Sequence, residues 1–132
     1  MSNRLEGCVI LVVDDDLDVL EGIDLALRAD GAETLRAEDG NQAIAVWRTA
    51  APAVVVLDMM LPKRSGFLVL EELLQADAPP IVVMVTANEG RRHEEYAKRL
   101  GVHAYLNKPV PLEMLVATIH TLLEEHDSTS SE

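Results

Sequence analysis

The sequence predicts an α/β fold in which parallel strands are joined by crossover helices. Five short apolar runs alternate along the chain with segments whose apolar residues recur at helical spacing, and this alternation is typical of a parallel sheet. Two runs, Cys8–Val13 and Ala53–Leu57, are apolar throughout, which is typical of strands covered by helices on both faces. A chain of 132 residues without internal repeats or a shift in composition predicts one domain.

The five strands are expected in order along the chain. The half-polar run Ala32–Ala37 has the composition of an edge strand, whereas the central run ends on a carboxylate, Asp58. The expected strands are Cys8–Val13, Ala32–Ala37, Ala53–Leu57, Ile81–Val85 and Val102–Leu106.

Capping residues predict where the helices begin and end. Asp16, Asp39 and Ser65 each precede a helical pattern, and their side-chain oxygens suit the N-cap position. Gly31 suits the left-handed stop of the first helix, and Gly90–Leu100 is expected to be a polar fourth helix. The buried faces are expected to carry Leu17, Leu20, Ile23 and Leu27 in the first helix, Ala43, Ile44 and Trp47 in the second, Leu70, Leu73 and Leu74 in the third, and Leu112, Leu115, Val116, Ile119, Leu122 and Leu123 in the fifth, which opens at Pro111.

Charge and composition exclude several classes of partner. A formal charge of −12 argues against nucleic-acid binding by this chain and against an anionic membrane surface. Apolar runs are far shorter than the roughly 20 residues that span a bilayer, and residues 1–7 lack the apolar core of a signal peptide, so we expect a cytoplasmic protein. Cys8 is the single cysteine, which excludes an internal disulfide and favours a buried thiol.

We expect three segments: an N-terminal extension at residues 1–7, the folded domain at 8–125 and a disordered polar tail at 126–132. No output or DNA-binding domain is visible within the sequence, which is therefore either a stand-alone domain or part of a longer protein.

Polar residues collect where the strands end. Asp14, Asp15, Asp58, Thr86 and Lys108 all follow apolar runs, and in a parallel sheet those ends share one edge. In a flavodoxin-like strand order of 2-1-3-4-5 the first and third strands are neighbours about 4.8 Å apart, which brings three carboxylates together. Lys108 supplies one positive charge, and the remaining negative charge predicts a hard divalent cation, Mg²⁺.

These residues resemble the motif set of the receiver domain of two-component response regulators, of the chemotaxis-regulator type. The resemblance covers the chain from Cys8 to about Glu125. It departs from the family pattern at Val102-His103-Ala104, where acidic or small residues are more usual. The matching residues are Asp14-Asp15, Asp58, Leu61-Pro62, Gly66, Thr86-Ala87, Tyr105 and Lys108-Pro109.

The resemblance implies a role for each site residue. Asp58 is the phosphoryl acceptor. The phosphoryl group comes from a sensor histidine kinase or a phosphotransfer protein, and Mg²⁺ is the cofactor. Asp15, Asp58 and the backbone carbonyl of Met60 ligate the ion directly, and Asp14 acts mainly through metal-bound water. Lys108 pairs with a phosphoryl oxygen. The implied protein is a signalling module whose own chemistry is Mg²⁺-dependent self-phosphorylation and self-dephosphorylation.

The resemblance also implies a conformational switch. Thr86 donates its hydroxyl to the phosphoryl group, and Tyr105 turns into the space that Thr86 leaves. This movement reshapes the surface of the fourth helix, fifth strand and fifth helix, which binds a downstream target or a second copy of the chain. Met60 and Asn88 influence the lifetime of the phosphoryl group, and Lys108-Pro109 is a cis peptide.

Three other functions are weaker. A phosphatase of the haloacid dehalogenase type carries a second acid two residues after its nucleophile, where this chain has Met60. A flavodoxin-like cofactor binder needs a Ser/Thr/Gly-rich phosphate loop after the first strand, where this chain has Asp14–Asp16. A degenerate receiver that only binds partners is disfavoured because every site residue is present. Asp14–Asp16 alone also suits a solvated helix start.

Overall fold

One parallel sheet forms the centre of the molecule. In the computed structural model, which describes residues 3–87 and 90–130, the strand order is β2-β1-β3-β4-β5, as the sequence predicts. The half-polar second strand lies at one edge. The strands are β1 (Val9–Val13), β2 (Glu33–Ala37), β3 (Val54–Leu57), β4 (Ile81–Thr86) and β5 (Ala104–Asn107).

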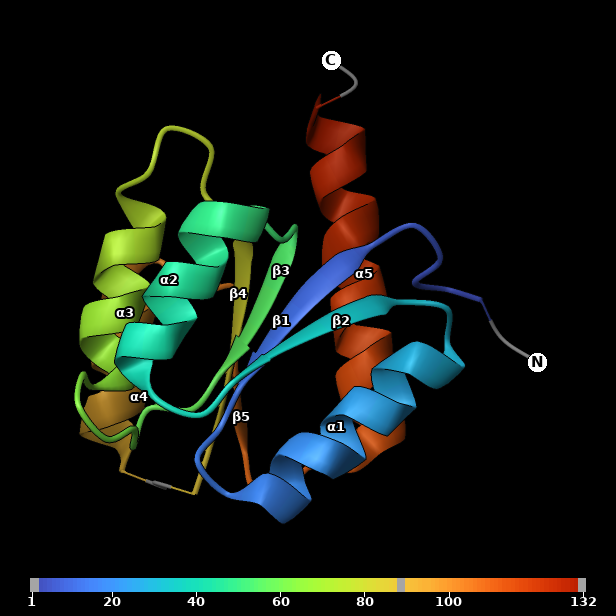
Figure 1. The fold of residues 1–132 in the computed structure, drawn as a ribbon. Coiled ribbons are helices and arrows are strands. Elements are labelled where there is room, and N and C mark those ends of the chain that lie inside the picture. The colour runs from blue at the N-terminus through green and yellow to red at the C-terminus, as the bar shows by residue number, and fades with distance from the viewer. Residues whose placement is uncertain (1–2, 88–89, 131–132) are drawn as a thin grey trace.

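Helices cover both faces of the sheet, with α1 and α5 on one face and α2, α3 and α4 on the other (Figure 1). Because successive strand side chains point to opposite faces, Ile10 and Val12 join the core under α1 and α5. Leu11 and Val13 join the core under the other three helices. The helices are α1 (Leu17–Ala29), α2 (Gly40–Ala50), α3 (Gly66–Leu74), α4 (Arg91–Leu100) and α5 (Leu112–Ser130).

The predicted caps are confirmed. The side chains of Asp16, Asp39 and Ser65 each accept a hydrogen bond of 2.8–3.3 Å from a backbone N–H two or three residues further on. Gly31 and Gly101 follow the ends of α1 and α4 with φ of 97° and 108°, the left-handed conformation that glycine adopts without a steric penalty.

Two leucines of the predicted buried faces are exposed, and for these two residues the prediction is wrong. Leu17 and Leu112 have exposed fractions of 59% and 40%. Each is the first residue of its helix. The helical period alone places them on the apolar face, but it does not show how much of the first turn of each helix is covered by the rest of the fold. Further along each helix the prediction is confirmed, as Leu20, Ile23, Leu27, Leu115, Val116 and Ile119 are buried.

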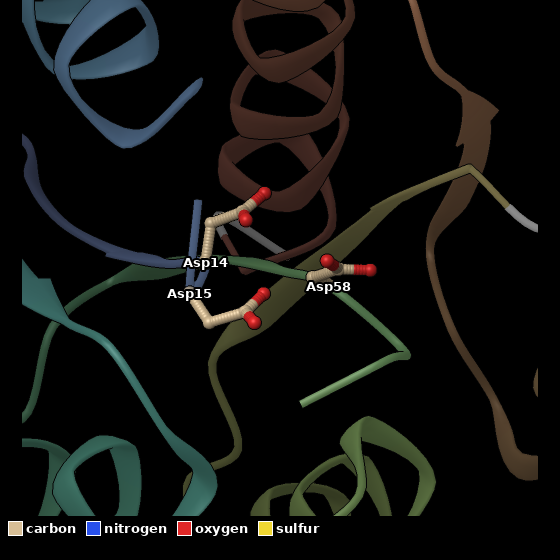
Figure 2. Close-up of side chains that lie close together, drawn as sticks. All are labelled: Asp14, Asp15 and Asp58. Atoms are coloured by element: carbon tan, nitrogen blue, oxygen red, sulfur yellow. The ribbon is translucent and has the colours of Figure 1, made fainter. Parts of the chain in front are cut away.

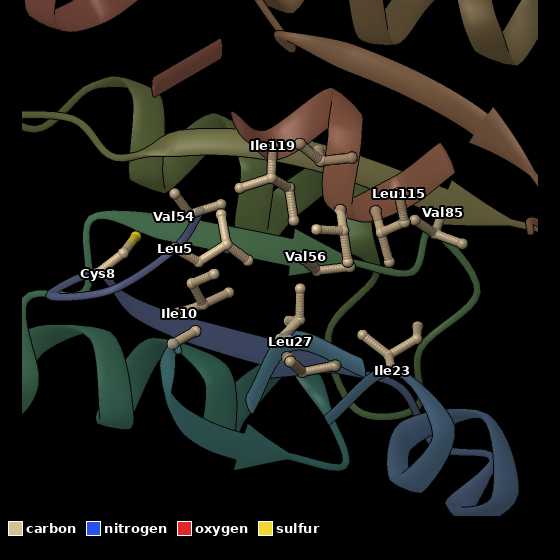
Figure 3. Close-up of a cluster of buried hydrophobic side chains, with 14 of the residues drawn as sticks. Leu5, Cys8, Ile10, Ile23, Leu27, Val54, Val56, Val85, Leu115 and Ile119 are labelled. Carbon is tan, nitrogen blue, oxygen red and sulfur yellow. The ribbon is translucent and has the colours of Figure 1, made fainter. Parts of the chain in front are cut away.

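The segment expected as an N-terminal extension contributes to the core. Leu5 is 1% exposed and packs with Ile10, Val54 and Ile119 (Figure 3), and its backbone N–H donates to the carbonyl of Asp30 over 2.9 Å. Cys8 is buried in the same cluster, as the sequence predicts. One leucine in a polar stretch gives no periodic pattern, so the sequence alone does not reveal this packing.

The last helix is longer than expected. The sequence predicts a disordered tail from residue 126, but α5 continues to Ser130. The sequence contains neither glycine nor proline after Pro111, so nothing in the chain forces an earlier end. Residues 131–132 lie outside the described part of the chain. Within residues 3–87 and 90–130, no helix combines the length and apolar character needed to cross a membrane.

Candidate functional site

The acidic residues reach one edge of the sheet because β1 and β3 are neighbours. Val13 lies opposite Leu57 in the register of these strands, so the residues that follow, Asp14 and Asp58, lie side by side. Backbone hydrogen bonds continue past the strand ends. The Asp58 N–H donates to the Val13 carbonyl, and the Asp14 N–H donates to the Ala37 carbonyl, each over 3.1 Å.

Three carboxylates converge at this edge, as the sequence predicts. Asp14, Asp15 and Asp58 each offer one oxygen, and these oxygens lie within 4.8 Å of one another. Figure 2 shows the carboxyl groups of Asp14 and Asp15 extending toward the side on which Asp58 lies. Asp14 and Asp58 are 2% and 5% exposed, whereas Asp15 is exposed to solvent. The cluster is therefore anchored in the protein and open on one side.

Lys108 crosses to this cluster from the loop after β5. Its Nζ lies 2.7 Å from Asp14 Oδ2 and 3.2 Å from Asp58 Oδ2. The backbone holds it there, because the Lys108 N–H donates to the Thr86 carbonyl over 2.9 Å. The Lys108-Pro109 peptide is cis, as expected.

The donor set fits a divalent cation. One ammonium group faces three carboxylates, which leaves two negative charges in a small space. All the side-chain donors are oxygens, the ligands that Mg²⁺ prefers, and the open side leaves room for the waters that Mg²⁺ usually keeps.

Burial and pairing shift the ionisation of this cluster. Burial raises the pKa of the Asp14 carboxyl, and the hydrogen bond from Lys108 only partly offsets that effect. Burial by itself lowers the pKa of Lys108, but the hydrogen bonds to Asp14 and Asp58 and the negative charges of both together outweigh it and raise the pKa. Lys108 therefore stays positively charged at neutral pH.

A glycine fixes the loop that follows Asp58. The Gly66 N–H donates to the Met59 carbonyl over 2.9 Å, and a Cβ at Gly66 would lie 2.2 Å from the Asp58 carbonyl oxygen. No side chain fits at that distance, so the close return of the loop requires glycine. Within the loop, the Met60 N–H donates to Asp58 Oδ1 over 3.1 Å. The ligand role of the Met60 carbonyl stays a prediction.

Comparison with known proteins decides the family. The model of the response regulator receiver domain matches residues 10–120. The chain belongs to this family. Receiver domains are phospho-accepting signalling modules of two-component systems. They bind Mg²⁺ at an acidic pocket and interact with histidine kinases and downstream targets.

Relatives of two lengths resemble this receiver. The DNA-binding response regulator MtrA of Mycobacterium tuberculosis is 35% identical over 123 residues, which cover 93% of this chain and 54% of MtrA. Protein PilH of Pseudomonas aeruginosa is 32% identical over 117 residues, 86% of this chain and 96% of PilH. The chain thus spans about half the length of MtrA and of the other transcriptional regulators compared, and nearly all of PilH.

Solved receiver structures have the same fold. A CheY-like receiver domain protein from Methanospirillum hungatei superposes with a TM-score of 0.88 at 25% identity, covering 92% of this chain and 98% of that chain. The receiver domain of NtrX from Brucella abortus superposes with a TM-score of 0.81 at 30% identity, covering 87% of this chain and 98% of that chain. These matches confirm the predicted fold and family.

The two expected switch residues of the receiver lie on adjacent strands. Thr86 is fully buried at the end of β4, and Tyr105 is half-buried on β5 opposite Met84. Burial raises the pKa of the Tyr105 hydroxyl, and the negative charges of Glu94 and Asp58 add to this. Their coupling stays a prediction, and Asn88 lies outside the described residues.

A cleft beside Lys108 is a feature that the sequence does not reveal. It has a volume of about 510 Å³ and lies between α1 and the loop after β5. Most of its lining residues are apolar, among them Ile23, Val110 and Leu112. The exposed Leu17 belongs to the same helix, α1. The leucines at the starts of α1 and α5 could have indicated an apolar surface here, but the helical pattern in the sequence assigns both to the core.

Proposed function

We propose that this receiver takes a phosphoryl group onto Asp58 from the phosphohistidine of a sensor histidine kinase or phosphotransfer protein. The observation that carries the proposal is the position of Lys108 Nζ, 3.2 Å from Asp58 Oδ2, beside a cluster of three carboxylates. This arrangement places one acceptor oxygen between a fixed cation and a site suited to Mg²⁺.

The proposed reaction is a direct displacement. An Asp58 carboxylate oxygen attacks phosphorus, the new O–P bond forms, and the P–N bond to the donor imidazole breaks. The electron pair of that bond stays on the imidazole nitrogen, which takes a proton from water. Asp15, Asp58 and the Met60 carbonyl, with Asp14 acting through water, would hold Mg²⁺, which would supply neutralising charge for the phosphoryl oxygens. Lys108 pairs with one of these oxygens and so replaces its contact to Asp58.

The proposed switch joins Thr86 to Tyr105. The Thr86 hydroxyl donates to the phosphoryl group, and Tyr105 turns toward the vacated space. A neutral hydrogen bond contributes about 1 kcal/mol and a charge-assisted one about 1.5–3 kcal/mol. Inverting a 1:99 population needs roughly 5.5 kcal/mol. Thr86 alone is therefore insufficient, and Lys108 and the metal supply the rest of the bias.

Two surfaces serve the proposed partners. The phosphodonor docks at the apolar cleft between α1 and the loop after β5, because this cleft adjoins Lys108. The downstream target, or a second copy of the phosphorylated chain, binds the α4-β5-α5 surface. The charge of −12 supports protein partners, rather than nucleic acid or an anionic membrane, for these 132 residues. The proposed location is the cytoplasm.

The proposal is tested with a small phosphodonor. The protein is incubated with Mg²⁺ and radiolabelled acetyl phosphate, and the labelled residue is located by mass spectrometry. We expect label on Asp58, none in Asp58→Asn, and wild-type labelling in Asp16→Asn. The last variant removes the same charge nearby, while asparagine still caps α1.

Label on another residue, or no label with Mg²⁺ present, contradicts the proposal. Catalytic turnover of phosphate esters would instead indicate a phosphatase acting on outside substrates.

A further inference from the structure

The loop that follows the phosphoryl acceptor rests on the start of a different helix. We call residues 59–65, between β3 and α3, the acceptor loop. The Gly40 N–H, at the first residue of α2, donates to the Pro62 carbonyl over 3.3 Å. Lys63 Nζ lies 3.6 Å from Asp39 Oδ2. The start of α2 and this loop lie beside each other (Figure 1).

Gly40 allows this contact because it has no side chain. A Cβ at Gly40 would lie 2.2 Å from the backbone oxygen of Arg64 and 2.6 Å from the Arg64 Cβ. Both distances are shorter than real Cβ contacts, and the opposing atoms belong to the backbone or sit next to it. Gly40 does not have a positive φ. Glycine is therefore needed here for close approach and not for an unusual backbone conformation.

The rest of the acceptor loop is held from the other side. Arg64 Nη1 lies 3.5 Å from Glu72 Oε2 on α3, and Arg48 of α2 lies 3.4 Å from the other oxygen of Glu72. Asp39 is itself fixed, since it is 5% exposed and its carboxylate caps α2. The acceptor loop is thus held by contacts to both α2 and α3. Met60, whose backbone N–H donates to Asp58 Oδ1, lies within this loop.

We propose that Gly40 is a positioning residue for the acceptor site: its bare backbone sets how far the acceptor loop approaches the sheet edge, and so where Met60 lies relative to Asp58. The inference rests on the proposed function, because it assigns a purpose to the position of Met60 as a metal ligand. It adds the first residue of α2 to a site otherwise built at the ends of β1, β3, β4 and β5.

Replacing Gly40 by alanine gives a definite expectation. The loop and the helix start must separate by about 1 Å, and a displacement of about 1 Å at a reaction site can lower a rate about 100-fold. Alanine forms helix better than glycine does, so a loss cannot be attributed to weaker helix formation. We expect Gly40→Ala to lower Mg²⁺ affinity and the rate of labelling by acetyl phosphate by about 10- to 100-fold.

The experiment uses the full chain with two controls. Mg²⁺ affinity is measured by calorimetric titration, and backbone amide chemical shifts of residues 58–66 are recorded by NMR without metal. Asn41→Ala changes an exposed residue in the same turn of α2, and Ile119→Val lowers stability from the opposite face of the sheet. Both controls should keep wild-type Mg²⁺ affinity and wild-type shifts at 58–66, whereas Gly40→Ala should change both.

A folded Gly40→Ala variant with wild-type Mg²⁺ affinity and wild-type shifts overturns the inference. So does an equal loss of affinity in Ile119→Val, because that would make the effect one of general stability. If wild-type protein binds no Mg²⁺ and takes no label, the proposed function fails, while the metal-free shifts still report whether Gly40 positions the loop.

A second pair of variants applies if Gly40→Ala does not fold. Lys63→Ala and Asp39→Asn remove opposite charges from one contact, and asparagine preserves the cap. Because Lys63 is exposed to solvent and the pair is therefore weak, each variant should lower Mg²⁺ affinity by about two- to fivefold. Opposite changes in affinity would indicate a purely electrostatic effect and overturn the positioning role of this contact.

Discussion

The ammonium group of Lys108 lies 2.7 Å from Oδ2 of Asp14, although the two residues are 94 positions apart in the sequence. The side chain of Asp14 is 3% exposed and that of Lys108 is 18% exposed, so water screens this pair weakly. Lys108 also contacts Asp58. The loop after β5 is thereby tied to the ends of β1 and β3, and the same lysine is available to a phosphoryl group on Asp58.

Removal of the Lys108 ammonium group should change stability and Mg²⁺ affinity in opposite directions. Lys108→Met leaves buried carboxylates without their partner, and we expect the free energy of unfolding without Mg²⁺ to fall by about 3 kcal/mol. Mg²⁺ affinity should rise, because three carboxylates then face the ion without a competing charge. Denaturant titrations with and without Mg²⁺ measure both effects.

Lys98→Met is the matched control for this lysine. Lys98 pairs with Glu94 at 2.8 Å on the exposed surface of α4, where such a pair contributes at most about 1 kcal/mol. Equal losses of stability in the two variants would refute the buried role of Lys108.

Asp24 should make stability depend on acid pH. Burial by itself raises its pKa, but the hydrogen bonds from Arg36, at 2.7 Å, and from Thr34, together with the charges of Arg36 and Arg28, outweigh burial and lower the pKa below the ordinary 3.8. The contribution of the carboxylate is present above pH 3.8 and is lost as the pH falls through the lower folded value.

Asp24→Asn should therefore be less stable than wild type at pH 7, by about 1–3 kcal/mol. This difference should shrink as the pH falls below about 4. Thermal denaturation from pH 7 to 3 tests this expectation, with the exposed Glu33→Gln as control. A difference that stays constant with pH would contradict it.

His103 should make stability depend on mildly acidic pH. The buried backbone N–H of Val82 donates to the ring atom Nδ1 of His103 over 3.0 Å. The backbone N–H of His103 donates to the Val82 carbonyl, also over 3.0 Å. A ring nitrogen that accepts a hydrogen bond must be unprotonated. Burial lowers the pKa of His103 below its ordinary 6.5, and His126 lowers it further. Because the folded pKa is the lower one, stability falls as the pH drops from 6.5 through the folded value.

Two variants separate the role of His103 Nδ1 as a hydrogen-bond acceptor from the effect of protonating the ring. Asparagine offers an oxygen near the place of Nδ1 and does not titrate, so His103→Asn should lose the pH dependence between 7 and 5. His103→Ala should be less stable than wild type by about 1 kcal/mol at pH 7, since the Val82 N–H loses its partner, and this difference should shrink as the pH falls toward 5. Parallel pH dependence in wild type and His103→Asn would exclude the role of this histidine.

Leu5 should be as important as a residue of the central sheet. Leu5→Ala removes a side chain that is 1% exposed, and we expect a loss of about 2–5 kcal/mol. Leu25→Ala, at a leucine that is 54% exposed, should change stability by less than about 0.5 kcal/mol. Similar unfolding midpoints for the two variants in urea would show that the first seven residues are a dispensable extension.

Sequence by itself determined the strand order, the helix caps and the convergence of Asp14, Asp15, Asp58 and Lys108. The caps and the convergence follow from local rules, whereas the strand order follows from the flavodoxin-like fold class that the pattern predicts. Parallel strands joined by helices place all their carboxyl ends at one edge, so residues that follow apolar runs must meet there. A side-chain oxygen before a helical pattern caps that helix from two or three residues away.

Only the tertiary structure decided the contacts that no local rule describes. Leu5 is buried because the chain before β1 packs against the core, whereas Leu17, the first residue of α1, is exposed. Gly40 meets Arg64, and His103 meets Val82, across 24 and 21 positions of sequence. Such contacts depend on how closely two separate segments approach, and residue type and spacing along one segment do not encode that distance.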